Sequence, residues 1–375
     1  MESKSERKKH INEIFLLRAV ACLSIVLFHA IETSINLNIS DSYSFNLIES
    51  IKVLLTFGTP TFVFISMLLI SYSYSDNLPK YFLIKRAKLL LMPFLAMAIF
   101  YAFTYVAKST NYIVDYSAVK LIIKYSIINI LGGYHGYFIL IIFQFYILCH
   151  LFNRYLSKMN PFATITVALI INLTYLAIFN YLPSPIDNKI VGYLWYGWFK
   201  IPFVAWVFYF VLAYYCGRNY DYFLYVIRKY EKIILVSAIA IGSTTIVLEN
   251  LNLIPSSSKS VMMIFFTTSM IGVIYNIATR IKTIPYFFIK ISQYSFSIYL
   301  IHMFYLTIMK NILLKHDIDF SVFSILFLFI VSIVASMLTA YIFNKFKFGK
   351  YLIGTINNNG AKLKTEKPKI HYVVD

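Results

Sequence analysis

The sequence has little charge and few residues that interrupt helices. Only 13% of its 375 residues are charged, whereas 59% are apolar or aromatic; a typical soluble domain has roughly 25% charged residues. Glycine and proline number only 12 and 10, which excludes collagen-like and low-complexity chains. Apolar runs of about twenty residues recur from Ile11 almost to the C-terminus, and each can cross about 30 Å of hydrocarbon. A soluble globular enzyme is therefore excluded.

Cysteine is scarce, and nucleotide and metal motifs are missing. The three cysteines, Cys22, Cys149 and Cys216, all lie inside apolar runs, so the sequence predicts neither a disulfide framework nor a cysteine metal site. It contains no Walker loop, dinucleotide fingerprint or metal-ligand spacing, so no metal cofactor is expected. Without a nucleic-acid motif, the net charge of +18 does not indicate a nucleic-acid partner.

The long apolar runs predict ten membrane-spanning helices. Only helices satisfy so many backbone polar groups in lipid when the alternating pattern of a barrel is absent. The fold class is therefore all-α, a polytopic integral membrane protein. The predicted spans are 11–33, 47–74, 89–107, 134–152, 161–181, 200–217, 233–250, 260–279, 291–313 and 321–344.

Lysine and arginine are distributed unequally between the two sides of this membrane domain. If the N-terminus is cytoplasmic, the cytoplasmic segments carry 24 of these residues and the opposite segments carry 9. The positive-inside rule then predicts that both termini are cytoplasmic, and ten spans satisfy this requirement. We expect a basic N-terminus over 1–10, a membrane domain over 11–344 and a basic cytoplasmic tail over 345–375, with the basic loops held against anionic lipid of the cell membrane.

Three polar side chains occupy the first span. Arg18 and His29 are eleven residues apart, which is three helical turns plus roughly 20°, so they point the same way about 16 Å apart. Glu32 follows three residues later, within reach of His29. Each residue alone has an alternative interpretation, in which Arg18 extends to the interface and His29 bonds a neighbouring helix. Together on one face, Arg18 and His29 favour function, lining one passage through the bilayer.

Two further features lie at or within later spans. His302, near the middle of the ninth span, is either catalytic or a structural hydrogen bonder. A basic turn precedes Pro93 at the third span. Its positive charge orients the helix, and phosphate binding is an additional role. The turn consists of Lys85, Arg86, Ala87 and Lys88.

Two aromatic segments are candidates for sugar binding. Tyr134, His135 and Tyr137 lie in a glycine-rich entry to the fourth span; glycine permits close approach and aromatic rings suit a sugar face. An ordinary interfacial loop fits this segment equally well. Trp195 and Trp198 fit either an interfacial aromatic belt, which we favour, or sugar stacking.

In their order along the chain, these motifs resemble the membrane-bound acyltransferase-3 family. That family's pattern of arginine, ten residues and histidine is matched by Arg18 and His29, the basic turn resembles its inner motif, and 294–302 looks like its closing signature. The resemblance runs from about Glu13 to Phe343. Segments 57–60, 136–138 and 144–145 look closest to the intercellular-adhesin branch, the membrane protein of staphylococcal poly-β-1,6-N-acetylglucosamine production.

This resemblance implies an integral-membrane O-acyltransferase. Such an enzyme moves an acetyl or succinyl group from cytoplasmic acyl-CoA to hydroxyls of an extracellular surface polysaccharide, here a biofilm adhesin. His29 would be the general base, and Arg18 with the basic turn would bind the phosphates of the donor. Glu32 would orient His29, which is our inference and not part of the family pattern. His302 would assist catalysis or hold the helices together.

Two other functions remain open at this point. The intercellular-adhesin branch is often assigned export of the polysaccharide, and export predicts that polymer accumulates inside the cell when the protein is absent. A scaffold for a polysaccharide synthase complex would tolerate loss of both Arg18 and His29. The enzyme is favoured, because an exporter of a long sugar has no evident need for one titratable group above one fixed cation.

Overall fold

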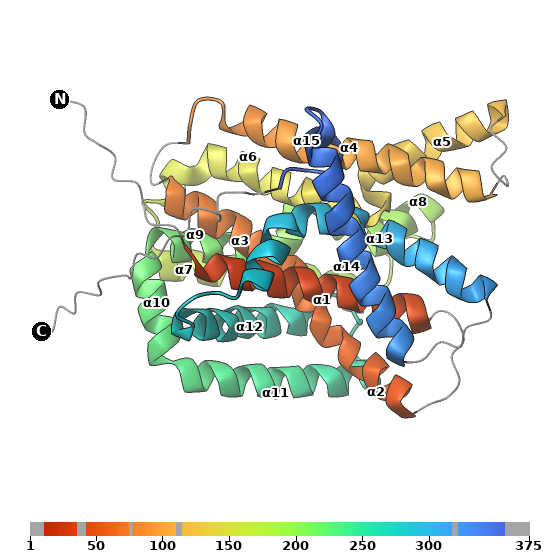
Figure 1. Cartoon of the computed structure of the whole chain (residues 1–375). Coiled ribbons are helices and arrows are strands. Elements are labelled where there is room, and N and C mark those ends of the chain that lie inside the picture. Colours follow the sequence, from red (N-terminus) through yellow and green to blue (C-terminus); the bar gives the residue numbers. More distant parts are fainter. Residues whose placement is uncertain (1–10, 36–42, 75–77, 110–114, 317–321, 357–375) are drawn as a thin grey trace, which may run out of the picture.

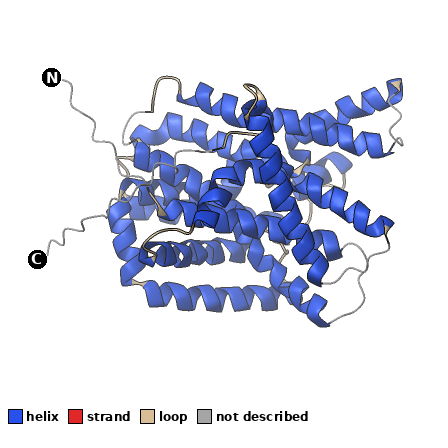
Figure 2. Cartoon of the chain, viewed as in Figure 1, coloured by secondary structure: helices blue, strands red, loops and turns tan. Residues whose placement is uncertain are grey.

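The computed structural model describes residues 11–35, 43–74, 78–109, 115–316 and 322–356. In these ranges every regular element is helical, and no strand occurs (Figure 2). They contain ten segments long and apolar enough to cross a membrane, each overlapping one predicted span. The all-α, ten-span prediction is confirmed. The spans are Glu13–Ile35, Leu47–Ser73, Phe82–Ser109, His135–Leu156, Pro161–Tyr181, Lys189–Arg218, Glu231–Asn250, Val261–Arg280, Tyr286–Lys315 and Phe323–Asn344.

The individual helices follow the chain in the order shown in Figure 1. The α-helices are α1 (Glu13–Ile35), α2 (Tyr43–Lys52), α3 (Gly58–Ser73), α4 (Phe82–Ser109), α5 (Tyr116–Ile128), α6 (Phe138–Leu156), α7 (Pro161–Tyr181), α8 (Lys189–Gly192), α9 (Val207–Arg218), α10 (Tyr220–Lys229), α11 (Glu231–Asn250), α12 (Val261–Arg280), α13 (Tyr286–Lys315), α14 (Val322–Asn344) and α15 (Gly349–Leu352). Short 3-10 or π segments are η1 (Val53–Phe57), η2 (Asn129–Gly133), η3 (His135–Tyr137), η4 (Tyr193–Trp198) and η5 (Phe203–Trp206).

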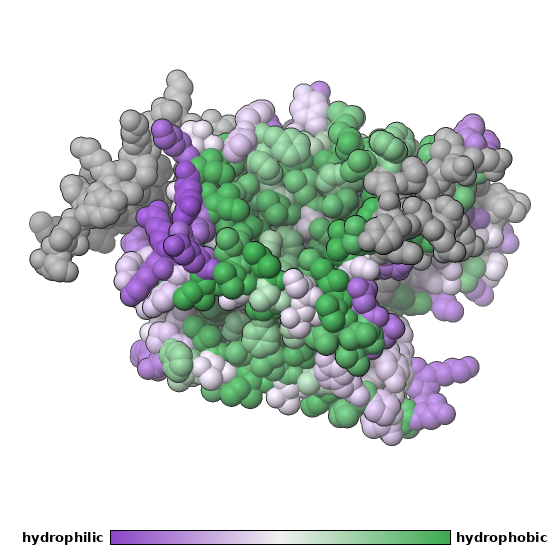
Figure 3. All heavy atoms as spheres, turned by 90° about the horizontal axis from the view of Figure 1, so that it is seen from below, coloured by the Kyte–Doolittle hydropathy of each residue, from purple (hydrophilic) through white to green (hydrophobic). Residues whose placement is uncertain are grey.

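The surface has the layered polarity of a membrane protein. In Figure 3 a broad apolar band covers the middle of the molecule, with hydrophilic residues gathered at its left and right. We call the end at which α1 and α4 begin the basic end, and the other the distal end (Figure 1). The prediction that the basic end is cytoplasmic continues to rest on the count of lysine and arginine.

Helix α1 lies at the centre of the bundle and contacts α3, α12, α13 and α14. Small residues make this packing close, since Ala19, Ala21 and Ala30 on α1 are fully buried. On α3, a Cβ at Gly58 would lie 2.6 Å from the Ala21 carbonyl oxygen. Glycine therefore lets the two helices approach, as small residues do at contacts between membrane helices.

Of the described α-helices longer than four residues, two lie outside the predicted spans. Helix α5 begins where the Asp115 carboxylate accepts from the backbone N–H of Ala118 at 2.7 Å, and it packs against α4 (Figure 1). Helix α10 runs across the basic end, in a segment predicted only as a cytoplasmic connection. Because a helix crossing the bundle ends contributes no long apolar run, hydropathy does not reveal it.

Candidate functional site

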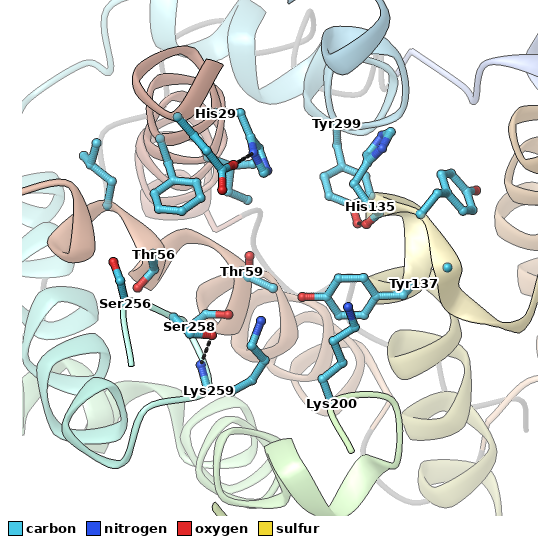
Figure 4. Close-up of a pocket in the computed structure, with 17 residues that line it drawn as sticks. His29, Thr56, Thr59, His135, Tyr137, Lys200, Ser256, Ser258, Lys259 and Tyr299 are labelled. Atoms are coloured by element: carbon cyan, nitrogen blue, oxygen red, sulfur yellow. Dashed lines mark hydrogen bonds and ion pairs between the residues drawn. The ribbon is translucent and has the colours of Figure 1, made fainter. Parts of the chain in front are cut away.

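A cavity of about 370 Å³ lies toward the distal end, beside α1 (Figure 4). Its walls come from α1, η1, the start of α3, the segment through η2 and η3, Lys200, the loop 256–259 and α13. Four α1 residues reach it, from Ile25 to Glu32. The Glu32 side chain is 46% exposed, so the cavity is accessible to water on this side.

His29 and Glu32 form a hydrogen-bonded pair at this cavity. The His29 Nδ1 lies 3.0 Å from the Glu32 Oε2, which confirms the predicted reach between them. Because an ionised carboxylate only accepts, Nδ1 donates, and in the neutral imidazole Nε2 keeps its lone pair. The His29 side chain is only 22% exposed. The arrangement is a half-buried imidazole held by a carboxylate, which is suited to accepting a proton.

Two more histidines adjoin this pair. His302 on α13 is fully buried, and its ring centroid lies 5.4 Å from those of both His29 and His135. The His302 Nδ1 donates to two carbonyl oxygens of its own helix, each 2.9 Å away. Its Nε2 is buried and has no hydrogen-bond partner among the described residues. Three histidines far apart in sequence thus meet at one place, although no group in the described ranges has the arrangement of a metal site.

The glycine-rich segment before α6 brings its aromatic residues to the cavity. Gly132 has a φ of 98°, in the left-handed region that glycine adopts without a steric penalty. The chain turns there, and Tyr134, His135 and Tyr137 all line the cavity. The Tyr134 hydroxyl donates to the Phe94 carbonyl oxygen at 2.9 Å. These three candidate sugar-binding residues therefore lie within one site.

The other aromatic candidates lie elsewhere. The cavity lining does not include Trp195 or Trp198. The Trp195 indole donates to the Leu182 carbonyl oxygen at 3.1 Å, and the Trp198 indole donates to that of Leu131 at 2.8 Å. Each indole therefore ties its own segment to a neighbouring one, and the interpretation of both as interfacial anchors stays a prediction.

Several cavity residues were not selected from the sequence. Lys200 and Lys259 place their Nζ atoms 4.5 and 5.9 Å from the centroid of the Tyr137 ring. Burial lowers the pKa of Lys259, which lies outside the spans, to about 8. Neither lysine belongs to a sequence motif, and in the sequence both contribute only to the positive charge on the outer side. The remaining unselected polar residues are Thr56, Thr59, Ser256, Ser257, Ser258 and Tyr299.

Arg18 lies on α1 in a different environment, near the basic end. Its charge interacts with Arg86, Tyr146 and Tyr275, and the Arg86 guanidinium lies 5.6 Å from the Tyr146 ring centroid. Arg18 and one residue of the basic turn, Arg86, therefore lie within electrostatic range of each other.

The rest of the basic turn lies at the surface, and Arg18 is separated from the cavity. Lys85 and Lys88 are exposed. Along α1 the cavity extends from Glu32 back to Ile25. Ile25 is about 10 Å, or two helical turns, from Arg18. This cavity therefore does not extend to Arg18, and α3 packs closely on α1 at Gly58, between Arg18 and His29. A single passage lined by both residues stays a prediction.

Comparison with known proteins agrees with this architecture. A family model described as an acyltransferase domain matches residues 11–344. A Bacillus subtilis protein named "Putative membrane-bound acyltransferase YfiQ" is 34% identical and aligns over 96% of this chain and 99% of its own length. No solved structure matches the chain.

Staphylococcal proteins are also similar. A Staphylococcus aureus relative is 30% identical over 92% of this chain and 97% of its own length. A Staphylococcus epidermidis relative is 28% identical over 92% of this chain and 96% of its own length. Both are named "Probable poly-beta-1,6-N-acetyl-D-glucosamine export protein". The ten spans and the family match together show that the chain is a multi-pass membrane protein that belongs to the membrane-bound acyltransferase-3 family.

Proposed function

We propose that this protein is an O-acyltransferase that moves an acetyl or succinyl group from acyl-CoA to a hydroxyl of a surface polysaccharide. The observation that carries the proposal is the His29–Glu32 pair, hydrogen-bonded at 3.0 Å beside a cavity with a polar wall. A sugar hydroxyl is a weak acid and a poor nucleophile, so its attack requires a base. A histidine with a free Nε2 supplies that base near neutral pH.

The proposed reaction balances in one transfer. The His29 Nε2 accepts the hydroxyl proton as the sugar oxygen attacks the thioester carbonyl carbon. The new C–O bond forms, the C–S bond breaks, and the proton passes to the departing thiolate to give free coenzyme A. Glu32 orients the imidazole and stabilises its protonated form, in the manner of other base-orienting carboxylates.

His302 and His135 support this geometry from α13 and η3. His302 is fixed through Nδ1 to its own helix and lies beside the His29 ring. His135 donates from Nε2 to the Leu300 carbonyl oxygen at 3.1 Å. We assign His302 a positioning role, in which it holds the His29 ring in place. The His302 Nδ1 is already hydrogen-bonded, and the His302 ring is fully buried.

The donor binds at the basic end in this proposal. Guanidinium groups recognise phosphate strongly, and Arg18 lies within electrostatic range of Arg86 there. The excess of basic residues on this side supports a cytoplasmic location. Since about 16 Å of α1 separates Arg18 from His29, the donor extends along α1, and the α1–α3 contact at Gly58 opens to admit its acyl end.

The acceptor is assigned from chemistry and from the names of relatives. Tyr134 and Tyr137 line the cavity, and the Thr56 and Ser256 side chains lie on the side opposite Tyr137 (Figure 4). Aromatic rings and hydroxyl groups both suit a carbohydrate. The staphylococcal relatives are named for poly-β-1,6-N-acetyl-D-glucosamine. We therefore propose an N-acetylglucosamine exopolysaccharide of the biofilm type as the acceptor.

The decisive experiment compares the extracellular polysaccharide of wild-type, His29→Ala and His150→Ala strains by mass spectrometry. His150 is an exposed histidine on α6 outside the cavity, so its variant is the matched control. We expect ester-linked acyl groups to vanish only with His29→Ala, at equal protein levels in the membrane. Unchanged acylation in that strain would refute the proposal.

Export is a second candidate, favoured by the names of the staphylococcal relatives. An exporter predicts polymer retained inside cells that lack the protein. The His29→Ala strain separates the two functions. Secretion of a normal amount of unacylated polymer supports the enzyme, whereas intracellular accumulation supports export.

A further inference from the structure

Two lysines lie on the cavity wall across from His29. Lys200 comes from the segment between η4 and η5, and Lys259 comes from the loop before α12. In Figure 4 both amino groups extend toward the Tyr137 ring from the side opposite His29. Their Nζ atoms lie 4.5 and 5.9 Å from that ring centroid. Two cations from separate segments thus lie near one aromatic ring.

The backbone at each lysine is fixed by a buried or half-buried neighbour. The Lys200 carbonyl oxygen accepts from the Trp206 indole at 2.7 Å. The Lys259 carbonyl oxygen accepts from the Asn180 side-chain amide at 2.9 Å. An anchored backbone reduces the entropy lost when a ligand binds. The two lysines are therefore preorganised at the cavity wall.

Neither lysine has a paired counterion among the residues that the structure describes. The charge of Glu32 acts on Lys259, but the Glu32 carboxylate is already hydrogen-bonded to His29. Although burial lowers the pKa of Lys259 to about 8, the group remains mostly cationic at neutral pH. Two partly desolvated cations that repel one another favour an anion between them.

We propose that Lys200 and Lys259 form an anion-binding subsite that receives a carboxylate of the substrate. This inference rests on the proposed acyl transfer and narrows its substrate class. The carboxylate belongs either to a dicarboxylic acyl group such as succinyl or to an acidic sugar of the acceptor. A cavity of about 370 Å³ is at the small end of ligand sites, so it accommodates the reacting groups and not a whole coenzyme.

The test uses purified full-length protein and two matched substrate pairs. The first pair is succinyl-CoA and acetyl-CoA with a neutral N-acetylglucosamine oligosaccharide. The second pair is a uronate-containing and a neutral oligosaccharide with acetyl-CoA. We expect wild type to prefer the anionic member of one pair, and that pair identifies the source of the carboxylate.

Charge-neutralising variants then assign the preference to the two lysines. In Lys200→Gln and Lys259→Gln the ratio of kcat/KM for the anionic over the neutral substrate should fall roughly 10- to 100-fold, the value of a charged hydrogen bond. Lys200→Arg and Lys259→Arg should retain most of the preference, which controls for folding. Lys189→Gln, an exposed lysine outside the cavity, should behave as wild type.

Three results would overturn the subsite. These are a wild type without preference in either pair, variants that slow neutral and anionic substrates equally, or a Lys189→Gln variant that loses the preference as well. If no substrate is acylated at all, the proposed function fails separately, and ligand binding decides the subsite. Succinate or glucuronate should then raise the Tm of wild type but not of the glutamine variants. If neither compound raises the Tm of wild type, the anion-binding subsite is rejected.

Discussion

The two ends of α1 hold polar groups at membrane depth by different means. Near the distal end, His29 faces a cavity with hydroxyls, lysines and access to water. Toward the basic end, the charge of Arg18 interacts with Tyr146, Tyr275 and Arg86. A charged or titratable group inside a membrane needs either solvent or polar partners. On α1, His29 has access to solvent and Arg18 has polar partners, about 16 Å away.

In the proposed reaction, the two ends of α1 bind different substrates. Water and hydroxyl groups suit an acceptor that arrives from solution, whereas guanidinium and tyrosine groups suit a phosphate-bearing donor. Helix α3 packs closely on α1 at Gly58, at a position between the two environments. The proposed reaction therefore needs both ends. Substitutions at the distal end should mainly lower kcat, whereas substitutions at the basic end should mainly raise the KM for acyl-CoA.

Loss of the base at the distal end should have the largest effect. For His29→Gln we expect kcat to fall by about 10²- to 10⁴-fold, because general base catalysis contributes that much, with little change in the KM for acyl-CoA. Thiol release from acyl-CoA in the presence of an oligosaccharide measures both constants. His150→Gln is the control. A rise in KM at normal kcat would reverse the roles assigned to the two ends.

Alteration of the basic end should weaken donor binding. Arg18→Gln or Arg86→Gln should raise the KM for acyl-CoA roughly 10-fold or more, the value of a charged hydrogen bond to phosphate, with a smaller change in kcat. The exposed Arg228 of α10 provides the control, as Arg228→Gln. Equal losses of kcat in all three arginine variants would contradict a specific donor site.

The Lys259 subsite adds a pH dependence to the distal end. Because burial lowers the pKa of Lys259 from 10.5 to about 8, its positive charge is lost as pH rises through that value. Glu32, Lys200, Tyr137 and His29 face the same cavity. We expect preference for an anionic substrate to fall about 10-fold between about pH 7 and about pH 9. In Lys259→Arg the preference should persist, and a decline there would assign the titration to another group.

The sequence was sufficient for the architecture because lipid leaves a long apolar run few alternatives. It also predicted the His29–Glu32 contact, since a spacing of three residues fixes it within one helix. His135 and His302 were selected separately, but their meeting with His29 depends on how α13 and η3 pack around α1. Helical periodicity describes one helix and not its neighbours.

The limits of prediction lie in the connections and in close packing. Lys200 and Lys259 belong to irregular segments whose meeting at Tyr137 is purely tertiary. The periodicity of α1 placed Arg18 and His29 on one face but did not reveal that Gly58 of α3 approaches between them. A cavity's extent is set by such contacts, which hydropathy and residue spacing do not register.

The smallest predicted effect on chemistry, and the most direct test of the boundary, comes from Gly58→Ala. A Cβ at position 58 would lie 2.6 Å from the Ala21 carbonyl oxygen and 2.7 Å from the Ser24 Oγ, whereas nothing lies within 4 Å of a Cβ at Gly192. Overpacking costs about 1–3 kcal/mol, so the Tm of Gly58→Ala in detergent should fall by roughly 2–10 °C, and that of Gly192→Ala should not. Since the added methyl group separates α3 from α1 between Arg18 and His29, both kcat and the KM for acyl-CoA should change modestly. A change confined to one constant would show that the contact supports one end alone.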